Sequence, residues 1–156
     1  MRGSTPNPEV AFHLNVRDRV SFLSAIALAL AGDARISLEG TSLPSRLHEI
    51  PSASNEESGK LRRNTYCPRL DFVILPLTPG TVHIILKELR SDDPGLDQLI
   101  HVQVEKAGLL QFGAYDEFAP NCVWCGPAVP VTLLDALRSK GILRSFVVPA
   151  SDSGDD

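Results

Sequence analysis

Two alternating segments near the middle of the chain constrain the fold most strongly. Residues 98–105 and 109–115 alternate apolar and polar side chains, and between them Lys106-Ala107-Gly108 supplies a glycine where a positive φ is needed. Alternation with a period of two predicts an antiparallel hairpin with one apolar and one polar face. The apolar face is expected to carry Ile100, Val102, Val104, Leu110 and Phe112, and the polar face His101, Gln103, Glu105, Gln111 and Tyr115.

Three other segments have the periodicity of helices that pack on a sheet. Residues 82–89 follow Thr78 and Pro79, the expected N-cap and first helical position. The apolar run 20–31 predicts a buried helix, with Asn15 as its N-cap and Asp18 in its first turn. Residues 133–137 predict a short third helix. Further strands are expected at residues 10–14, 34–39, 70–75 and 143–148, of which 70–75 is expected to be central.

The order of these elements predicts an α+β fold. We expect a mainly antiparallel sheet with helices packed on one face, as a split βαβ (ferredoxin-like) sandwich with a C-terminal hairpin-helix-strand extension. The 156 residues are expected to form a single domain, 1–156. Residues 41–68 lose periodicity and predict a long flexible insertion with a helical turn near 43–50, whereas residues 150–156 predict a frayed acidic tail.

A sheet with helices on one face leaves its other face open. That face is expected to pack against the insertion, to form a dimer with a second copy, or to bind a partner. The formal net charge of -4 argues against binding nucleic acid through phosphates and favours a basic protein partner. The run 20–31 is too short to span a membrane, and Glu9 and Asp18 beside it argue against an export signal. Three cysteines cannot pair completely, which favours a reducing cytoplasm.

Residues 121–127 are expected to form a loop that contains two cysteines and the single tryptophan. Trp124-Cys125-Gly126-Pro127 resembles the first part of the thioredoxin active-site motif, but Ala128 stands where that family has its second cysteine. Cys122 and Cys125 nevertheless have the spacing of a redox pair or of two zinc ligands, and Cys67 and His48 would have to complete a zinc site. A thiol-redox or zinc protein is therefore the alternative function. The competing interpretation places Cys125 and Trp124 in the core.

Aromatic and acidic residues gather after the hairpin and indicate a protein interface. Tyr115, Asp116, Glu117 and Trp124 combine aromatic anchors with carboxylates that would steer a basic partner, whereas Phe118 is expected in the core. Trp124 suits either the interface or the core. The predicted partner-binding residues are Tyr115, Asp116, Glu117 and Trp124, together with His101, Gln103 and Gln111 on the polar hairpin face.

The sequence contains none of the common hydrolase, metalloprotease or nucleotide-binding motifs. We therefore expect a non-enzymatic binding domain without a cofactor. In size, acidity and lack of catalytic motifs the chain is similar in general character to bacterial immunity proteins, and the resemblance implies an inhibitor that occludes a cognate toxin. A small enzyme is a further alternative, in which His101 or Tyr115 would act in a pocket between the open sheet face and the insertion.

Overall fold

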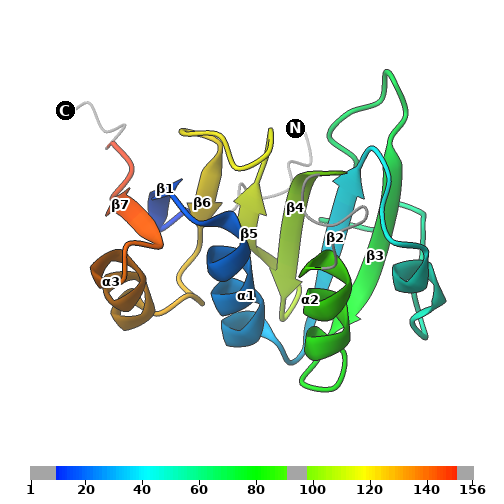
Figure 1. Cartoon of the computed structure of the whole chain (residues 1–156), viewed down its shortest axis with the longest axis horizontal. Coiled ribbons are helices and arrows are strands. Elements are labelled where there is room, and N and C mark those ends of the chain that lie inside the picture. Colours follow the sequence, from blue (N-terminus) through cyan, green and yellow to red (C-terminus); the bar gives the residue numbers. More distant parts are fainter. Residues whose placement is uncertain (1–9, 91–97, 151–156) are drawn as a thin grey trace, which may run out of the picture.

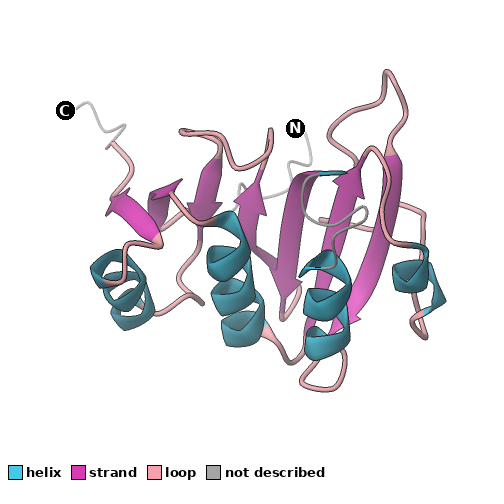
Figure 2. Ribbon diagram, in the orientation of Figure 1, coloured by secondary structure: helices cyan, strands magenta, loops and turns pink. Residues whose placement is uncertain are grey.

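The computed structural model describes residues 10–90 and 98–150 and has the predicted α+β class (Figure 1). Helices α1, α2 and α3 lie against one face of an antiparallel sheet, as Figure 2 shows. The elements are β1 (Phe12–Val16), α1 (Arg19–Leu30), β2 (Ala34–Gly40), the 3-10 helix η1 (Ser45–Glu49), β3 (Asp71–Leu77), α2 (Val82–Arg90), β4 (Leu99–Lys106), β5 (Leu109–Ala114), β6 (Val123–Cys125), α3 (Val131–Ser139) and β7 (Leu143–Val147).

The seven strands of this sheet have the order β3-β2-β4-β5-β6-β1-β7, and each neighbouring pair is antiparallel. The ferredoxin-like detail of the prediction is not confirmed. A split βαβ unit places one strand between the two strands that its helix connects, whereas β4, β5 and β6 all lie between β1 and β2. The connection from β1 to β2 through α1 therefore crosses three strand positions. The β4–β5 hairpin and β6, which come later in the chain, occupy these positions.

Local sequence signals explain where the first two helices begin. Asp18, and not the predicted Asn15, is the N-cap of α1, because its carboxylate accepts a hydrogen bond of 3.1 Å from the N–H of Ser21. Asn15 instead belongs to β1, which lies two residues later than predicted. Before α2, the hydroxyl of Thr78 accepts from the N–H of Thr81 at 3.1 Å, but residues 79–81 form a turn and α2 begins at Val82, so Pro79 is not the first helical residue as predicted.

Strand β3 lies at the edge of the sheet, so the prediction of a central strand is wrong. Its hydrophobic sequence reflects burial on both faces, since Val73 and Leu75 pack in the main core while Phe72 and Ile74 pack in a second, smaller cluster. Pro76 lies inside β3, where the sequence predicted an end. An edge strand tolerates proline because one side of its backbone forms no ladder.

The predicted hairpin is present, but it reverses through two residues, Ala107 and Gly108 at φ 53° and 80°, because Lys106 still belongs to β4 and not to the predicted three-residue connection. A bulge between Val104 and Glu105 shifts the register with β5, so that Glu105 pairs with Leu110. Leu110 therefore packs in the second cluster, on the face opposite to the one predicted.

The main core lies between the sheet and the helices. Phe22, Ile26 and Leu30 of α1 and Ile85 and Leu89 of α2 are buried against the sheet strands. No helix within the two described ranges combines the length and the apolar character needed to cross a membrane. The sequence Asp92-Asp93-Pro94-Gly95, which predicts a turn after α2, and the predicted tail from residue 151 lie outside the described residues.

Candidate functional site

The insertion (residues 41–68) packs against the polar face of the sheet. Its buried Leu61 contacts Phe72 and Ile74 of β3, and Leu110 of β5 packs against the same cluster. Ser54 forms a backbone bridge with Ile74, which ties the insertion to the edge strand. The expected helical turn is present as η1. Three ways to cover the open face were expected, and the structure shows the first of them. The insertion covers the part of the face formed by β3, β2 and β4.

Two buried polar side chains of the sheet bind the backbone of the insertion. Glu39 is 1% exposed, and its carboxylate accepts from the N–H groups of Asn64 at 2.7 Å and Thr65 at 3.2 Å. Gln103 accepts from the N–H of Arg62 at 3.0 Å. Buried polar groups with such partners define one arrangement, because leaving them unpaired costs free energy. The strand residues therefore fix the path of residues 62–65.

His101 connects the insertion to the segment after β5. Its Nε2 lies 2.9 Å from the hydroxyl of Thr65, and its Nδ1 accepts from the N–H of Asp116 at 3.2 Å. Because Nδ1 accepts, the ring proton is on Nε2, which donates to Thr65. The ring is 5% exposed, and the ring of Tyr115 lies 5.8 Å away. Both nitrogens of His101 are thus occupied, which leaves neither for acid-base work on a substrate in this structure.

Residues 116–121, which we call the acidic turn, have an unusual backbone. Asp116, Glu117 and Phe118 have successive φ values of 52°, 60° and 63°. Left-handed residues other than glycine normally occur singly and cost about 1–2 kcal/mol each. Hydrogen bonds hold this conformation, since the N–H of Asp116 binds His101 and that of Glu117 binds the carbonyl of Ile100 at 2.9 Å. Strain that is fixed in this way clusters at functional sites.

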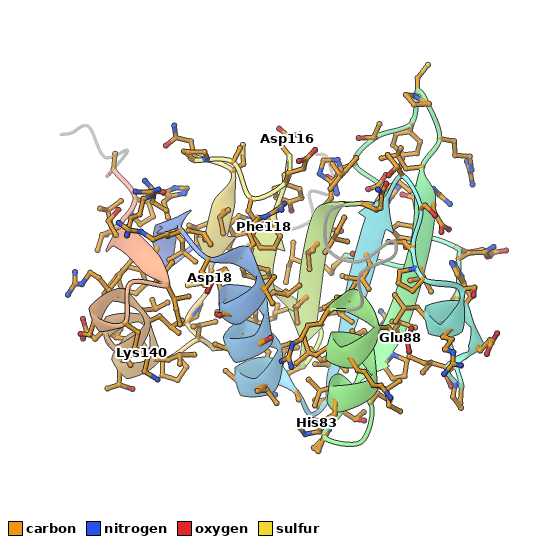
Figure 3. The ribbon with its side chains drawn as sticks, viewed as in Figure 1. Asp18, His83, Glu88, Asp116, Phe118 and Lys140 are labelled. Atoms are coloured by element: carbon orange, nitrogen blue, oxygen red, sulfur yellow. The ribbon has the colours of Figure 1, made fainter. Side chains whose placement is uncertain are left out.

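The acidic turn separates its charged residues from its aromatic one. The side chains of Asp116 and Glu117 are exposed, whereas Phe118 is 5% exposed and its ring lies 6.3 Å from that of Phe22 in α1. Figure 3 shows Asp116 at the outer end of the turn and Phe118 nearer the start of α1. The prediction that Phe118 is a core residue is confirmed. The turn therefore presents two carboxylates on a base that is anchored in the core.

Trp124 lies on a strand and not in the expected loop. Residues 123–125 form β6, which pairs with β5 and β1. Trp124 is 8% exposed, and its indole lies over Gly113, where an added Cβ would be 2.4 Å from Nε1 and 2.7 Å from the hydroxyl of Tyr115. Gly113 is needed at this position for the close approach of both side chains. Trp124 therefore supports the turn from below, and of the two places that the sequence left open for it the structure shows the core.

The seven predicted partner-binding residues divide into three groups. Asp116 and Glu117 are exposed. His101, Gln103, Trp124 and the half-buried Tyr115 form the second group and support the two acids from below. Within this group Gln103 donates to the Tyr115 hydroxyl at 3.2 Å. Gln111 lies apart from both, because its side chain accepts from the N–H of Ala128 at 3.0 Å and positions the loop before α3. Four of the seven residues are buried: His101, Gln103, Gln111 and Trp124.

Glu57 accepts three hydrogen bonds from other residues of the insertion. Its Oε1 accepts from the hydroxyl of Tyr66 at 2.7 Å, from Nε of Arg62 at 2.9 Å and from the N–H of Arg63 at 3.0 Å. The Tyr66 hydrogen bond, followed by that of Arg62, lowers the pKa of Glu57 to about 2. Tyr66 is 55% exposed and follows Thr65, which contacts His101. An exposed aromatic residue therefore lies in the loop that His101 joins to the acidic turn.

The cysteines do not form a reactive pair in this structure. All three are free. Burial raises the pKa of Cys125 to about 12, and partial burial followed by the charge of Asp116 raises the pKa of Cys122. Cys125 packs in the main core beside Phe112, whereas Cys67 is exposed in the insertion. Within residues 10–90 and 98–150, no group of three or more histidine, cysteine or acidic side chains is arranged to hold a metal ion.

Sequence reasoning missed the partners that the insertion contributes. The alternation of β2 is a signal that could have identified Glu39, because Arg35, Ser37 and Glu39 alternate with apolar residues. In the sheet these three residues pair with Glu105, Gln103 and His101 of β4. Glu57, Thr65 and Tyr66 carried no periodic signal, since their roles depend on how an irregular segment folds across the sheet. Comparisons of the chain with protein-family models, curated proteins and solved structures found no match.

Proposed function

We propose that this chain is a non-enzymatic protein-binding domain that occludes a basic partner through the acidic turn. The observation that carries the proposal is the pair of exposed carboxylates, Asp116 and Glu117, on a left-handed backbone that buried His101 fastens to the sheet. A contact surface that is already ordered loses less entropy when it binds. Carboxylates on such a surface steer a cationic partner and fix its orientation.

Tyr66 supplies the aromatic part of the proposed contact surface. Aromatic side chains supply much of the energy of protein interfaces, and acids around them add specificity. Tyr66 takes the interface role that was one of the two predicted for Trp124, because Tyr66 is 55% exposed and Trp124 only 8%. The contact surface thus consists of Tyr66, Asp116 and Glu117, above the buried side chains that hold both loops.

An inhibitor or immunity protein that blocks a cognate toxin is the specific form of this proposal. Such a protein needs a rigid surface of complementary charge, which the acidic turn supplies. The three free cysteines support a reducing compartment such as the cytoplasm.

The test is capture of the partner from the native source, followed by measurement of its affinity for charge variants. Asp116→Lys with Glu117→Lys should weaken binding by about tenfold or more and reduce its dependence on salt. Glu49→Lys with Glu56→Lys is the matched control, because these exposed acids lie in the insertion and the change in charge is the same. Equal affinities of the two double variants, or no protein ligand at all, would overturn the proposal.

A further inference from the structure

Helices α1 and α2 lie side by side on the same face of the sheet (Figure 1), and residues of both line a groove. The groove has a volume of about 520 Å³. Leu86, which is 4% exposed, forms its floor, and Leu28, which is 48% exposed, forms one wall. Arg90 connects the two helices, since its NH2 donates to the hydroxyl of Ser24 at 2.9 Å. The groove is therefore apolar at its base and is held open between two packed helices.

The composition of α1 is unusual for a helix at a surface. After Arg19, its only polar residues are Ser21 and Ser24, although Val20, Leu28 and Ala29 are exposed. A surface helix normally carries charged residues on its outer side, and a helix that is apolar all round is normally covered. The exposed side of α1 thus has the character of a surface that another element covers.

The charge along the groove indicates what kind of element fits it. His83, Lys87 and Arg90 lie on one side of α2, and among the described residues no carboxylate lines the groove. This contrasts with the net charge of -4 for the whole chain and with a second groove, beside Arg35, that is lined by Glu56 and Glu57. An apolar floor beside a row of cations complements a helix with apolar residues on one side and carboxylates at its edge.

We propose that the α1–α2 groove docks an acidic amphipathic helix of a partner protein. One apolar side chain of that helix fills the space between Leu28 and Leu86, and its carboxylates bind Lys87 and Arg90. This surface is separate from the acidic turn, which is proposed to bind a basic partner and does not line the groove. The inference therefore stands independently of the proposed function.

The probe is a synthetic amphipathic peptide of about 18 residues, long enough to form a helix in isolation. Leucines occupy positions i, i+3, i+4 and i+7, and glutamates occupy the flanking positions. A second peptide has the same leucines with lysines in place of the glutamates. We expect the acidic peptide to bind the full chain at least about tenfold more tightly than the basic one, with amide NMR shifts concentrated at Leu28, Leu86 and Lys87.

The test variants change Lys87 of α2 and Leu28 of α1, which are both exposed, and the control variants change exposed residues in or next to α3. Lys87→Glu and Leu28→Ser should each weaken binding of the acidic peptide by about tenfold. Lys140→Glu makes the same change at an exposed position after α3, which Figure 3 shows away from α2, and Val131→Ser makes a comparable apolar-to-serine change at an exposed position of α3. Neither residue lines the groove, so both variants should leave binding unchanged. Asp116→Lys should also leave it unchanged, which separates this test from that of the proposed function.

Three outcomes would overturn the inference. The first is equal or tighter binding of the basic peptide, and the second is an equal loss of binding in Lys87→Glu and Lys140→Glu. The third is self-association of the unmodified chain that Leu28→Ser abolishes, measured by analytical ultracentrifugation. In that case a second copy, and not an acidic helix, covers α1.

Discussion

The backbone N–H of Asp116 donates to Nδ1 of His101 at 3.2 Å, while Nε2 of the same ring lies 2.9 Å from the hydroxyl of Thr65. One buried side chain thus joins two irregular segments that are far apart in the sequence. Its imidazole must be neutral to accept from Asp116, because a proton on Nδ1 would face another donor. The position of the acidic turn and the path of the insertion therefore depend on the same ring.

Replacement of His101 by leucine should destabilise the fold. The change leaves the N–H of Asp116 and the hydroxyl of Thr65 without their partner, which is expected to lower the free energy of unfolding by about 2–3 kcal/mol. His13→Leu is the matched control, because His13 is exposed on β1, and it should change stability by less than about 0.5 kcal/mol. Urea unfolding measures both. Equal effects of the two changes would contradict the anchoring role of His101.

Gly113→Ala should displace the indole of Trp124. The new Cβ would lie 2.4 Å from Nε1 of Trp124 and 2.7 Å from the Tyr115 hydroxyl, so both side chains must move, at an expected cost of about 1–3 kcal/mol. The single tryptophan reports the movement through its fluorescence maximum. Gly80→Ala is the control, since the nearest atom to its added Cβ is 3.7 Å away. An unchanged spectrum in Gly113→Ala would show that the indole does not lie over Gly113.

Glu57 should make the stability of the insertion dependent on acid. Its pKa of about 2 in the folded chain lies below the ordinary 4.5, so the ionised carboxylate stabilises the fold above pH 4.5, and this contribution disappears as the pH falls toward 2. Glu57→Gln should therefore be less stable than the unmodified chain at pH 7, with a difference that shrinks between pH 4.5 and 2. Urea midpoints at several pH values test this, with Glu49→Gln on η1 as control. A constant difference across that range would contradict the assignment.

The three thiols should react in a fixed order with a small alkylating reagent at pH 8. Exposed Cys67 reacts first and half-buried Cys122 more slowly, because burial and Asp116 raise the pKa of the Cys122 thiol. Cys125, whose pKa is raised to about 12 by burial, should react only after unfolding. Mass spectrometry with and without urea gives the order. Fast reaction of Cys125 in the folded chain, or a bridge between Cys122 and Cys125, would favour the thiol-redox function instead.

Periodicity predicted the parts of the fold that bury one regular face. The stripe of α2, the run of α1 and the alternation of β2 and β4 each identify an element, because a core imposes its period on the sequence. Periodicity did not predict that β1 joins β6 and β7, since the strand order depends on contacts between distant segments. It missed β6 because Val123, Trp124 and Cys125 are all buried, which leaves no alternation to detect.

The candidate site was predicted in part for a related reason. Asp116 and Glu117 were recognised from their composition, and the polar face of the hairpin from its alternation. Their connection required the insertion, in which Thr65 makes two hydrogen bonds to the sheet and the N–H of Arg62 makes one, without a repeated pattern. Trp124 was interpreted as exposed or buried with equal support, and only the register that sets it beside Gly113 decides for burial.

Glu117→Gly should stabilise the chain while weakening its binding. Glu117 has a φ of 60°, a conformation that glycine adopts with little strain. Relief of the strain stabilises the folded chain, whereas the greater conformational entropy of glycine stabilises the unfolded chain. The net effect should raise the free energy of unfolding by about 0.5–1 kcal/mol. Glu49→Gly, in the ordinary backbone of η1, should lower it by a similar amount, which makes the sign of the effect diagnostic. Loss of the Glu117 carboxylate should also lower the affinity for the partner. In the proposed function the strained backbone is retained because it holds this charge in position. A destabilised Glu117→Gly chain would show that the left-handed turn carries no strain, and unchanged affinity would show that Glu117 does not contact the partner.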